Sequence, residues 1–227
     1  MEHLNQVEGW LSPHSASFMA DLAKLQTELG IRGSLGEIGV HMGKSFIVLK
    51  LNASQGEKCF AIDVFSDQHL NVDYSGYGDR EIFSANVERW TGDCDVHIIQ
   101  KSSLSVRPAD ILKQCGPVRL MSIDGGHSEE CTYNDLRLAE RVLTDSGVAI
   151  IDDYFNESWP GVASGVARYL YRWGSKLKPF MFSPNKIYFA RAGFHAMYRD
   201  KMRARHNGAL YKQSKMFGYE IDIFHPH

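Results

Sequence analysis

Two apolar, strand-like runs end in acidic residues that could hold a metal ion. Asp124 follows "MSI", and Asp152 and Asp153 follow "VAII". The carboxyl ends of neighbouring parallel strands open into one crevice, so we expect the three carboxylates to converge. Carboxylates this close repel one another unless a cation or a proton neutralises them, and Mg²⁺ prefers such oxygen ligands. The pattern predicts a metal site at Asp124, Asp152 and Asp153; the alternative is that Asp153 caps the following turn and Asp152 is solvated.

A histidine stands at the mouth of the same predicted crevice. His127 lies three residues beyond Asp124. Histidine ordinarily titrates near pH ~6.5, so a neutral imidazole there can accept a proton at cellular pH. General-base help of this kind typically accelerates a reaction by roughly 10²–10⁴. Asp124 and His127 are therefore the predicted catalytic residues, and the alternative for His127 is a helix-start histidine bonded to backbone.

The stretch "EIGVHMGKS", Glu37 to Ser45, is similar to a phosphate-binding loop but has the wrong spacing. Gly39 and Gly43 enclose three residues where a P-loop has four, and the dinucleotide pattern G-x-G-x-x-G is absent as well. An acid at a strand end followed by two glycines remains, and Asp63 ends the next strand-like run, where a carboxylate can accept ribose hydroxyls. The pattern favours a nucleoside without a polyphosphate. The alternative is that the glycines only permit a tight turn and Asp63 only caps a helix.

With Asp63 in register, Glu37, Gly39 and Gly43 resemble the cofactor loop of class I S-adenosylmethionine-dependent methyltransferases. The resemblance implies that the glycine turn approaches the methionine part of the cofactor and that Asp63 binds the ribose. That family usually carries a polar residue or an acid after the third strand to meet the adenine. In "IIQKSSLS", Ser102 is the candidate for this contact.

Three further segments, "IDGGHSEE", "NDLRLAERVL" and "GVAIIDDYFNESWPGV", are similar to metal-dependent O-methyltransferases of the macrocin O-methyltransferase type, over roughly residues 33–191. The resemblance implies that Asp124, Asp152 and Asp153 bind Mg²⁺, that His127 is the base, and that Asp124 also contacts the cofactor. It implies methyl transfer from S-adenosylmethionine to a hydroxyl of a small molecule or of a sugar or glycan precursor. Two alternatives stay open: a hydroxylase-like relative with a redox metal, and a cofactor-binding module without catalysis.

The elements that must position these residues follow from alternating patterns. The runs "SLGEI", "CFAIDVF", "VHIIQ", "VRLMSI" and "GVAIID" are separated by segments long enough for crossover helices, and "KPFMFS" and "KIYFAR" are close enough to form an antiparallel hairpin. The pattern predicts an α/β fold: a doubly wound, mostly parallel, Rossmann-like seven-stranded sheet with helices on both faces and an antiparallel strand at one edge. Residues 66–80 are polar and too long for an ordinary connection, so they are predicted to form a lid or binding loop.

The remaining predictions concern organisation and setting. Residues 1–192 are predicted to form a methyltransferase domain with an N-terminal helical extension, and residues 193–227 a C-terminal helical extension. With 25 basic and 27 acidic residues, the chain has no excess charge that favours nucleic acid. Its four cysteines form no C-x-x-C pair, which favours a reducing, cytoplasmic setting. No run approaches the ~20 apolar residues of a membrane span, so stable membrane insertion is not predicted, and a homo-oligomer stays open.

Overall fold

The computed structural model describes residues 2–225. Its helices are α1 (Pro13–Glu28), α2 (Lys44–Leu51), α3 (Arg80–Thr91), α4 (Pro108–Cys115), α5 (Glu129–Val142), α6 (Pro160–Tyr171) and α7 (Ala192–Arg205), with short 3₁₀ turns at Glu2–Gln6, Gln68–Leu70, Ser103–Ser105 and Asn207–Ala209. Its strands are β1 (Ser34–Ile38), β2 (Cys59–Asp63), β3 (His97–Gln100), β4 (Val118–Ile123), β5 (Leu143–Ile151), β6 (Leu177–Ser183), β7 (Lys186–Arg191), β8 (Leu210–Met216) and β9 (Tyr219–Phe224). No described helix is long and apolar enough to cross a bilayer.

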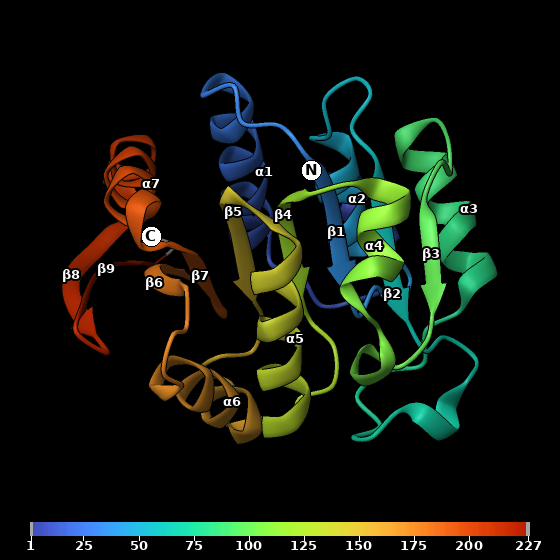
Figure 1. Ribbon diagram of the computed structural model, residues 1–227. Coiled ribbons are helices and arrows are strands. Elements are labelled where there is room, and N and C mark those ends of the chain that lie inside the picture. The colour runs from blue at the N-terminus through green and yellow to red at the C-terminus, as the bar shows by residue number, and fades with distance from the viewer. Residues whose placement is uncertain (1, 226–227) are drawn as a thin grey trace.

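The strands form one sheet in the order β3-β2-β1-β4-β5-β7-β6-β9-β8. Pairing is parallel from β3 through β5, and the hairpin of β6 and β7 joins β5 in antiparallel orientation. Helices lie on both faces of the sheet (Figure 1). The predicted α/β class is confirmed, but within residues 2–225 the sheet has nine strands rather than the predicted seven.

The two additional strands come from the predicted C-terminal helical extension. Up to residue 225, α7 is the only α-helix of that segment; β8 and β9 form an antiparallel hairpin, and β9 pairs in parallel with β6. The strands escape sequence analysis because β8 is an edge strand whose residues are exposed or half-buried on both faces, so no alternation marks it. The predicted domain division at residue 192 stays a prediction.

Each face of the sheet has its own hydrophobic core. One core contains buried residues of α1, α2, α3 and α7, and the other contains those of α4, α5 and α6. Local signals fix where the helices begin: Ser12 caps α1 by accepting the Ser15 amide, and Ser128 caps α5 by accepting the Cys131 amide. The cap at Ser128 fixes the position of the short segment that follows β4, which carries Asp124 and His127.

Candidate active site

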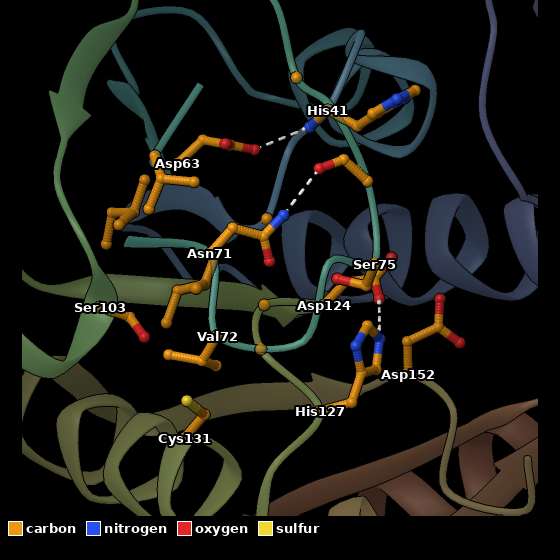
Figure 2. Close-up of a pocket in the computed structure, with 18 of the residues that line it drawn as sticks. His41, Asp63, Asn71, Val72, Ser75, Ser103, Asp124, His127, Cys131 and Asp152 are labelled. Atoms are coloured by element: carbon orange, nitrogen blue, oxygen red, sulfur yellow. Dashed lines mark hydrogen bonds and ion pairs between the residues drawn. The ribbon is translucent and has the colours of Figure 1, made fainter. Parts of the chain in front are cut away.

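A pocket of about 430 Å³ opens at the carboxyl ends of the parallel strands. It lies where the strand order reverses between β1 and β4, the place where open α/β sheets bind ligands. In Figure 2, Asp63 and His41 lie at one end of the pocket, and Asp124, His127 and Asp152 lie at the other. Of the residues predicted for the site, the following line the pocket: Gly39, Asp63, Ser102, Asp124, His127, Asp152 and Asp153.

The glycine turn brings two strand ends into close contact. Gly39 has φ +76°, and a Cβ at this position would overlap the carbonyl oxygen of Asp124. The turn also continues the strand ladder, since the Gly39 amide donates to Ile62 at 2.8 Å and the Asp124 amide donates to Ile38 at 2.8 Å. Only glycine fits a left-handed backbone pressed against a neighbouring strand end. Gly39 therefore forms the pocket floor between β1 and β4.

Two predicted cofactor residues of the same motif do not line the pocket. Gly43, with φ +95°, precedes α2, and a Cβ there would meet the Phe83 ring at 3.1 Å. Glu37 is fully buried, and burial, followed by the nearby charge of Asp124, raises its pKa to about 8. Both residues support the turn from behind, and their predicted direct contact with a cofactor stays a prediction.

Asp63 holds the glycine turn in place. Its Oδ2 accepts the amides of Val40 at 2.8 Å and His41 at 2.9 Å, and its Oδ1 accepts the Phe65 amide at 2.7 Å. A carboxylate offers about four acceptor positions, so one position on Oδ1 remains for a ligand hydroxyl. Sequence analysis assigned Asp63 to a ribose but did not anticipate that it anchors the turn.

The side wall of the pocket is part polar and part apolar. Ser102 lines it together with Lys101 and Ser103, and Val72 and Cys131 add apolar surface (Figure 2). This wall has the mixed character that a purine base requires, with hydroxyl groups beside an apolar surface. The predicted adenine contact of Ser102 stays a prediction.

A carboxylate and histidine cluster lies opposite Asp63. Ligand atoms of Asp124, His127 and Asp153 all lie within 4.8 Å of one another. The His127 Nε2 atom is 3.1 Å from Asp153 Oδ2 and 3.8 Å from Asp124 Oδ1. Asn156 and Asn185 donate to the other oxygen of Asp153, which leaves Oδ2 facing the histidine. The cluster offers two carboxylate oxygens and one imidazole nitrogen, a set that suits an oxygen-seeking divalent cation.

Asp152 has a charged partner that the sequence did not predict. Its carboxylate is buried and pairs with the buried ammonium of Lys186 on β7, and Asn185 donates to it at 3.1 Å. Burial lowers the pKa of Lys186, but the charges of Asp152 and Asp124 outweigh burial and raise this pKa, whereas burial raises the pKa of Asp152 against the opposing charge of Lys186. Lys186 is thus the charge partner of Asp152, which lines the pocket close to the charges of Asp124 and Asp153. The group of ligand atoms within 4.8 Å contains His127 and not Asp152, and the predicted metal contact of Asp152 stays a prediction.

His127 is held by carboxylates on several sides. Burial lowers its pKa, but hydrogen bonds to Asp124, Asp153 and Asp73 outweigh burial and raise the pKa to about 11. Burial likewise raises the pKa of Asp153, but the hydrogen bond from His127 and those from two asparagines lower this pKa to about 2. Without a cation the ring is therefore an imidazolium. A cation held by Asp124 and Asp153 would take up negative charge that favours this form, and the ring would then be able to accept a proton.

The predicted lid, residues 66–80, covers the pocket. Asp73 accepts hydrogen bonds from the His127 amide and from His127 Nδ1, the latter at 3.0 Å. The neighbouring Gly76 and Gly78 lie against His41 and Asp63 respectively. The lid therefore contacts both ends of the pocket, and sequence analysis gave no signal for which lid residue would meet His127.

The lysine of "GKS" has a structural role. Lys44 Nζ donates to the Gly9 carbonyl at 2.9 Å, and this contact holds the N-terminal segment beside the pocket. Trp10 then lies with its ring centroid 5.4 Å from that of His41 and remains 77% exposed at the pocket mouth. On the other side, the Trp159 ring stacks on His127 at 4.3 Å. Aromatic side chains thus flank the pocket, one of them from the N-terminal segment.

A doubly wound sheet with a pocket at its switch point, a carboxylate beside the glycine turn and a carboxylate–histidine cluster opposite is typical of Rossmann-like enzymes that bind a nucleoside cofactor. Residues 37–154, slightly more than half of the 227-residue chain, match the family described as methyltransferase domain, and the chain belongs to this family. The predicted resemblance to class I S-adenosylmethionine-dependent methyltransferases is confirmed.

Solved structures show the same fold at low identity. The O-methyltransferase NovP is 16% identical, with 78% of this chain and 80% of that chain covered and a TM-score of 0.63. CalS11, a TDP-rhamnose 3'-O-methyltransferase of calicheamicin biosynthesis, is 16% identical over 81% of this chain and 82% of that chain, with a TM-score of 0.54. MycE of the mycinamycin pathway, solved with Mg, SAH and mycinamycin VI, is 12% identical over 81% of this chain and 50% of that chain, with a TM-score of 0.54. No curated protein matches the sequence.

Proposed function

We propose that this enzyme transfers the methyl group of S-adenosylmethionine to a hydroxyl of a small molecule or sugar, and that Mg²⁺ bound at Asp124 and Asp153 assists the transfer. The observation that carries the proposal is the placement of the Asp124, His127 and Asp153 cluster in the same pocket as Asp63, at its opposite end. NovP and CalS11 are O-methyltransferases, and MycE was solved with Mg and SAH, which supports the same assignment for a chain of this fold.

The cofactor half of the pocket fits a nucleoside. The free acceptor position of Asp63 suits a ribose hydroxyl, and Gly39 lines the pocket at the strand ends, where its backbone can approach a ligand. The wall that contains Ser102 and Cys131 is the place for the adenine. Bound S-adenosylmethionine supplies a methyl group on a sulfonium, which an acceptor lone pair must approach in line.

The acceptor half fits a hydroxyl that has to lose a proton. Bound Mg²⁺ supplies positive charge that lowers the pKa of a neighbouring hydroxyl. Asp124 and Asp153 hold that charge in place, and Nε2 of His127 faces the pocket, where it accepts the proton. Stacking by Trp159 keeps the imidazole ring in this orientation. Asp152, already neutralised by Lys186, is left out of the metal set.

Turnover with isotopically labelled cofactor against a panel of sugar and phenolic acceptors tests the proposal. EDTA should abolish transfer and Mg²⁺ should restore it, and full activity in EDTA would remove the cation from the model. His127→Ala should lower kcat by roughly 10²-fold or more while the Kd of S-adenosylmethionine stays near the wild-type value. His69→Ala is the matched control, because His69 is an exposed histidine of the lid outside the cluster.

Asp63→Ala tests the cofactor half independently. The variant should weaken S-adenosylmethionine binding at least about tenfold in calorimetry, since the ribose contact and the anchor of the turn are both lost. Unchanged affinity would refute the assignment of the ribose.

The two rival functions have different signatures. A hydroxylase would consume oxygen with bound iron, although one histidine and two aspartates are not the two-histidine, one-carboxylate set of such iron sites. A binding module without catalysis would be insensitive to His127→Ala.

A further inference from the structure

We infer that Asp73, on the lid, is a positioning residue that orients His127, so that closing the lid and completing the proton-accepting group are one event. The inference rests on the proposed function and adds a residue to it that belongs to none of the strand ends. Its basis is a pair of hydrogen bonds from a single residue to a single carboxylate oxygen: the backbone amide and the ring Nδ1 of His127 both donate to Asp73 Oδ2.

This pair of contacts fixes the ring. With the amide and Nδ1 tied to one oxygen, the side chain of His127 has little freedom to rotate, and its Nε2 atom points toward Asp153 at 3.1 Å. A proton held on Nδ1 by Asp73 leaves Nε2 as the nitrogen that exchanges a proton with the pocket. A carboxylate that accepts a hydrogen bond from one ring nitrogen also orients histidines that bind a metal through the other nitrogen. Asp73 therefore has the same effect whether His127 acts as base or contacts the cation.

Asp73 is itself held by the internal structure of the lid. Its other oxygen, Oδ1, accepts the Ser75 amide at 3.1 Å. Asn71 braces the turn by donating to the Gly76 carbonyl at 2.9 Å and accepting the Tyr74 amide at 3.1 Å. The Asp73 side chain is only 14% exposed, so its carboxylate faces His127 rather than solvent. The lid thus presents Asp73 as a rigid unit.

The lid and the pocket also close together at other points. Val72 lies against Gly126 of the segment after β4, and Gly78 lies beside Asp63. Any opening that admits cofactor or acceptor must separate these contacts, and with them the bond between Asp73 and His127. His127 is then oriented only when the pocket is covered, which limits proton removal to the state in which water is excluded.

The experiment compares Asp73→Ala with Asp73→Asn and with the control Asp67→Asn. The asparagine side chain introduced by Asp73→Asn can still accept a hydrogen bond from Nδ1–H. Asp67 lies on the same lid, accepts from Gln100 at 3.1 Å and does not touch His127. We expect Asp73→Ala to lower kcat by about 10- to 100-fold with less than threefold change in the Kd of S-adenosylmethionine, Asp73→Asn to recover most of this loss, and Asp67→Asn to match wild type.

Two readouts do not require turnover. In proton NMR the Nδ1–H of His127, assigned by its absence in His127→Gln, should exchange slowly in wild type and rapidly in Asp73→Ala. Chymotrypsin should cleave at the exposed Tyr74 and Tyr77 several-fold faster in Asp73→Ala than in Asp67→Asn. Wild-type proton exchange and cleavage in Asp73→Ala would overturn the inference. If wild type transfers no methyl group, the proposed function fails, while these two readouts still decide the role of Asp73.

Discussion

Lys186→Met tests the buried ion pair between Lys186 and Asp152. Methionine preserves most of the length and volume of the lysine side chain, so the change removes the ammonium and creates no large cavity. The Asp152 carboxylate then stays buried, with the Asn185 amide at 3.1 Å as its remaining side-chain donor and with the like charges of Asp124 and Asp153 nearby. Breaking a buried pair on one side costs roughly 3–5 kcal/mol.

That cost is large relative to the total stability, which for a domain is about 5–15 kcal/mol. With a urea m-value of about 3 kcal/mol per M, the unfolding midpoint should fall by roughly 1–1.7 M. The unpaired Asp152 has a folded-state pKa above its unfolded value because burial favours the neutral acid. A raised pKa contributes stability at low pH that is lost as the pH rises, so the deficit of the variant should be smaller at pH 5 than at pH 8.

Urea unfolding followed by circular dichroism measures both effects. The double variant Asp152→Asn/Lys186→Met should recover most of the loss, because no unpaired charge remains, and the cycle gives the coupling between the two residues. Lys215→Met is the control, since Lys215 pairs with Glu220 at the surface at 3.1 Å. A free energy of unfolding within about 1 kcal/mol of wild type for Lys186→Met would refute the buried pair. Asp152 would then be available to a cation, as the sequence predicts.

Three further predictions concern the pocket floor and its mouth. Gly39→Ala should abolish S-adenosylmethionine binding in calorimetry and lower the melting temperature, because a Cβ overlaps the Asp124 carbonyl; normal binding would contradict the close approach. Glu37, whose pKa burial raises to about 8, contributes stability that is lost as pH rises from about 4.5 through 8. Between pH 6 and pH 8.5 the free energy of unfolding of wild type should therefore fall by about 2 kcal/mol more than that of Glu37→Gln, and equal slopes would refute the burial argument. Lys44→Met should release the N-terminal segment, seen as a lower fluorescence anisotropy of Trp10 assigned by Trp10→Phe, and an unchanged anisotropy would show that the Gly9 contact is dispensable.

The parallel part of the sheet could be predicted because buried strands have continuous apolar sequences. "SLGEI" and "VRLMSI" coincide with β1 and β4, and both are fully buried. The acids that end such runs necessarily lie at one edge, so Asp63, Asp124 and Asp153 were found by the position of the strand ends. β8 could not be predicted because its side chains are exposed or half-buried throughout, without alternation of buried and exposed positions.

The partners of the site residues could not be predicted, because they come from distant segments whose approach depends on the folded chain. Lys186 is the first residue of an apolar strand, where a charged side chain is expected to reach solvent. It lies 34 residues from Asp152 in sequence, yet its ammonium donates to the Asp152 carboxylate. Asp73 is 54 residues from His127 and is one of several polar lid residues. Spacing identifies which residues end a strand, but it does not determine which of them is neutralised by a residue on another element.

Four exposed aromatic side chains lie on connections that border the pocket, and of these Trp10 lines it. Trp10 precedes α1, Tyr74 and Tyr77 lie on the lid, and Phe155 follows β5, and all four are at least 65% exposed. Replacing exposed side chains of this kind typically changes stability by about 0.5 kcal/mol or less, whereas replacements in the two cores cost several times more. These four positions are therefore free to vary over evolutionary time, whereas the pocket floor at Gly39 is constrained. A lineage, or a directed-evolution library confined to these positions, can acquire new acceptors without rebuilding the half of the pocket that holds the methyl donor.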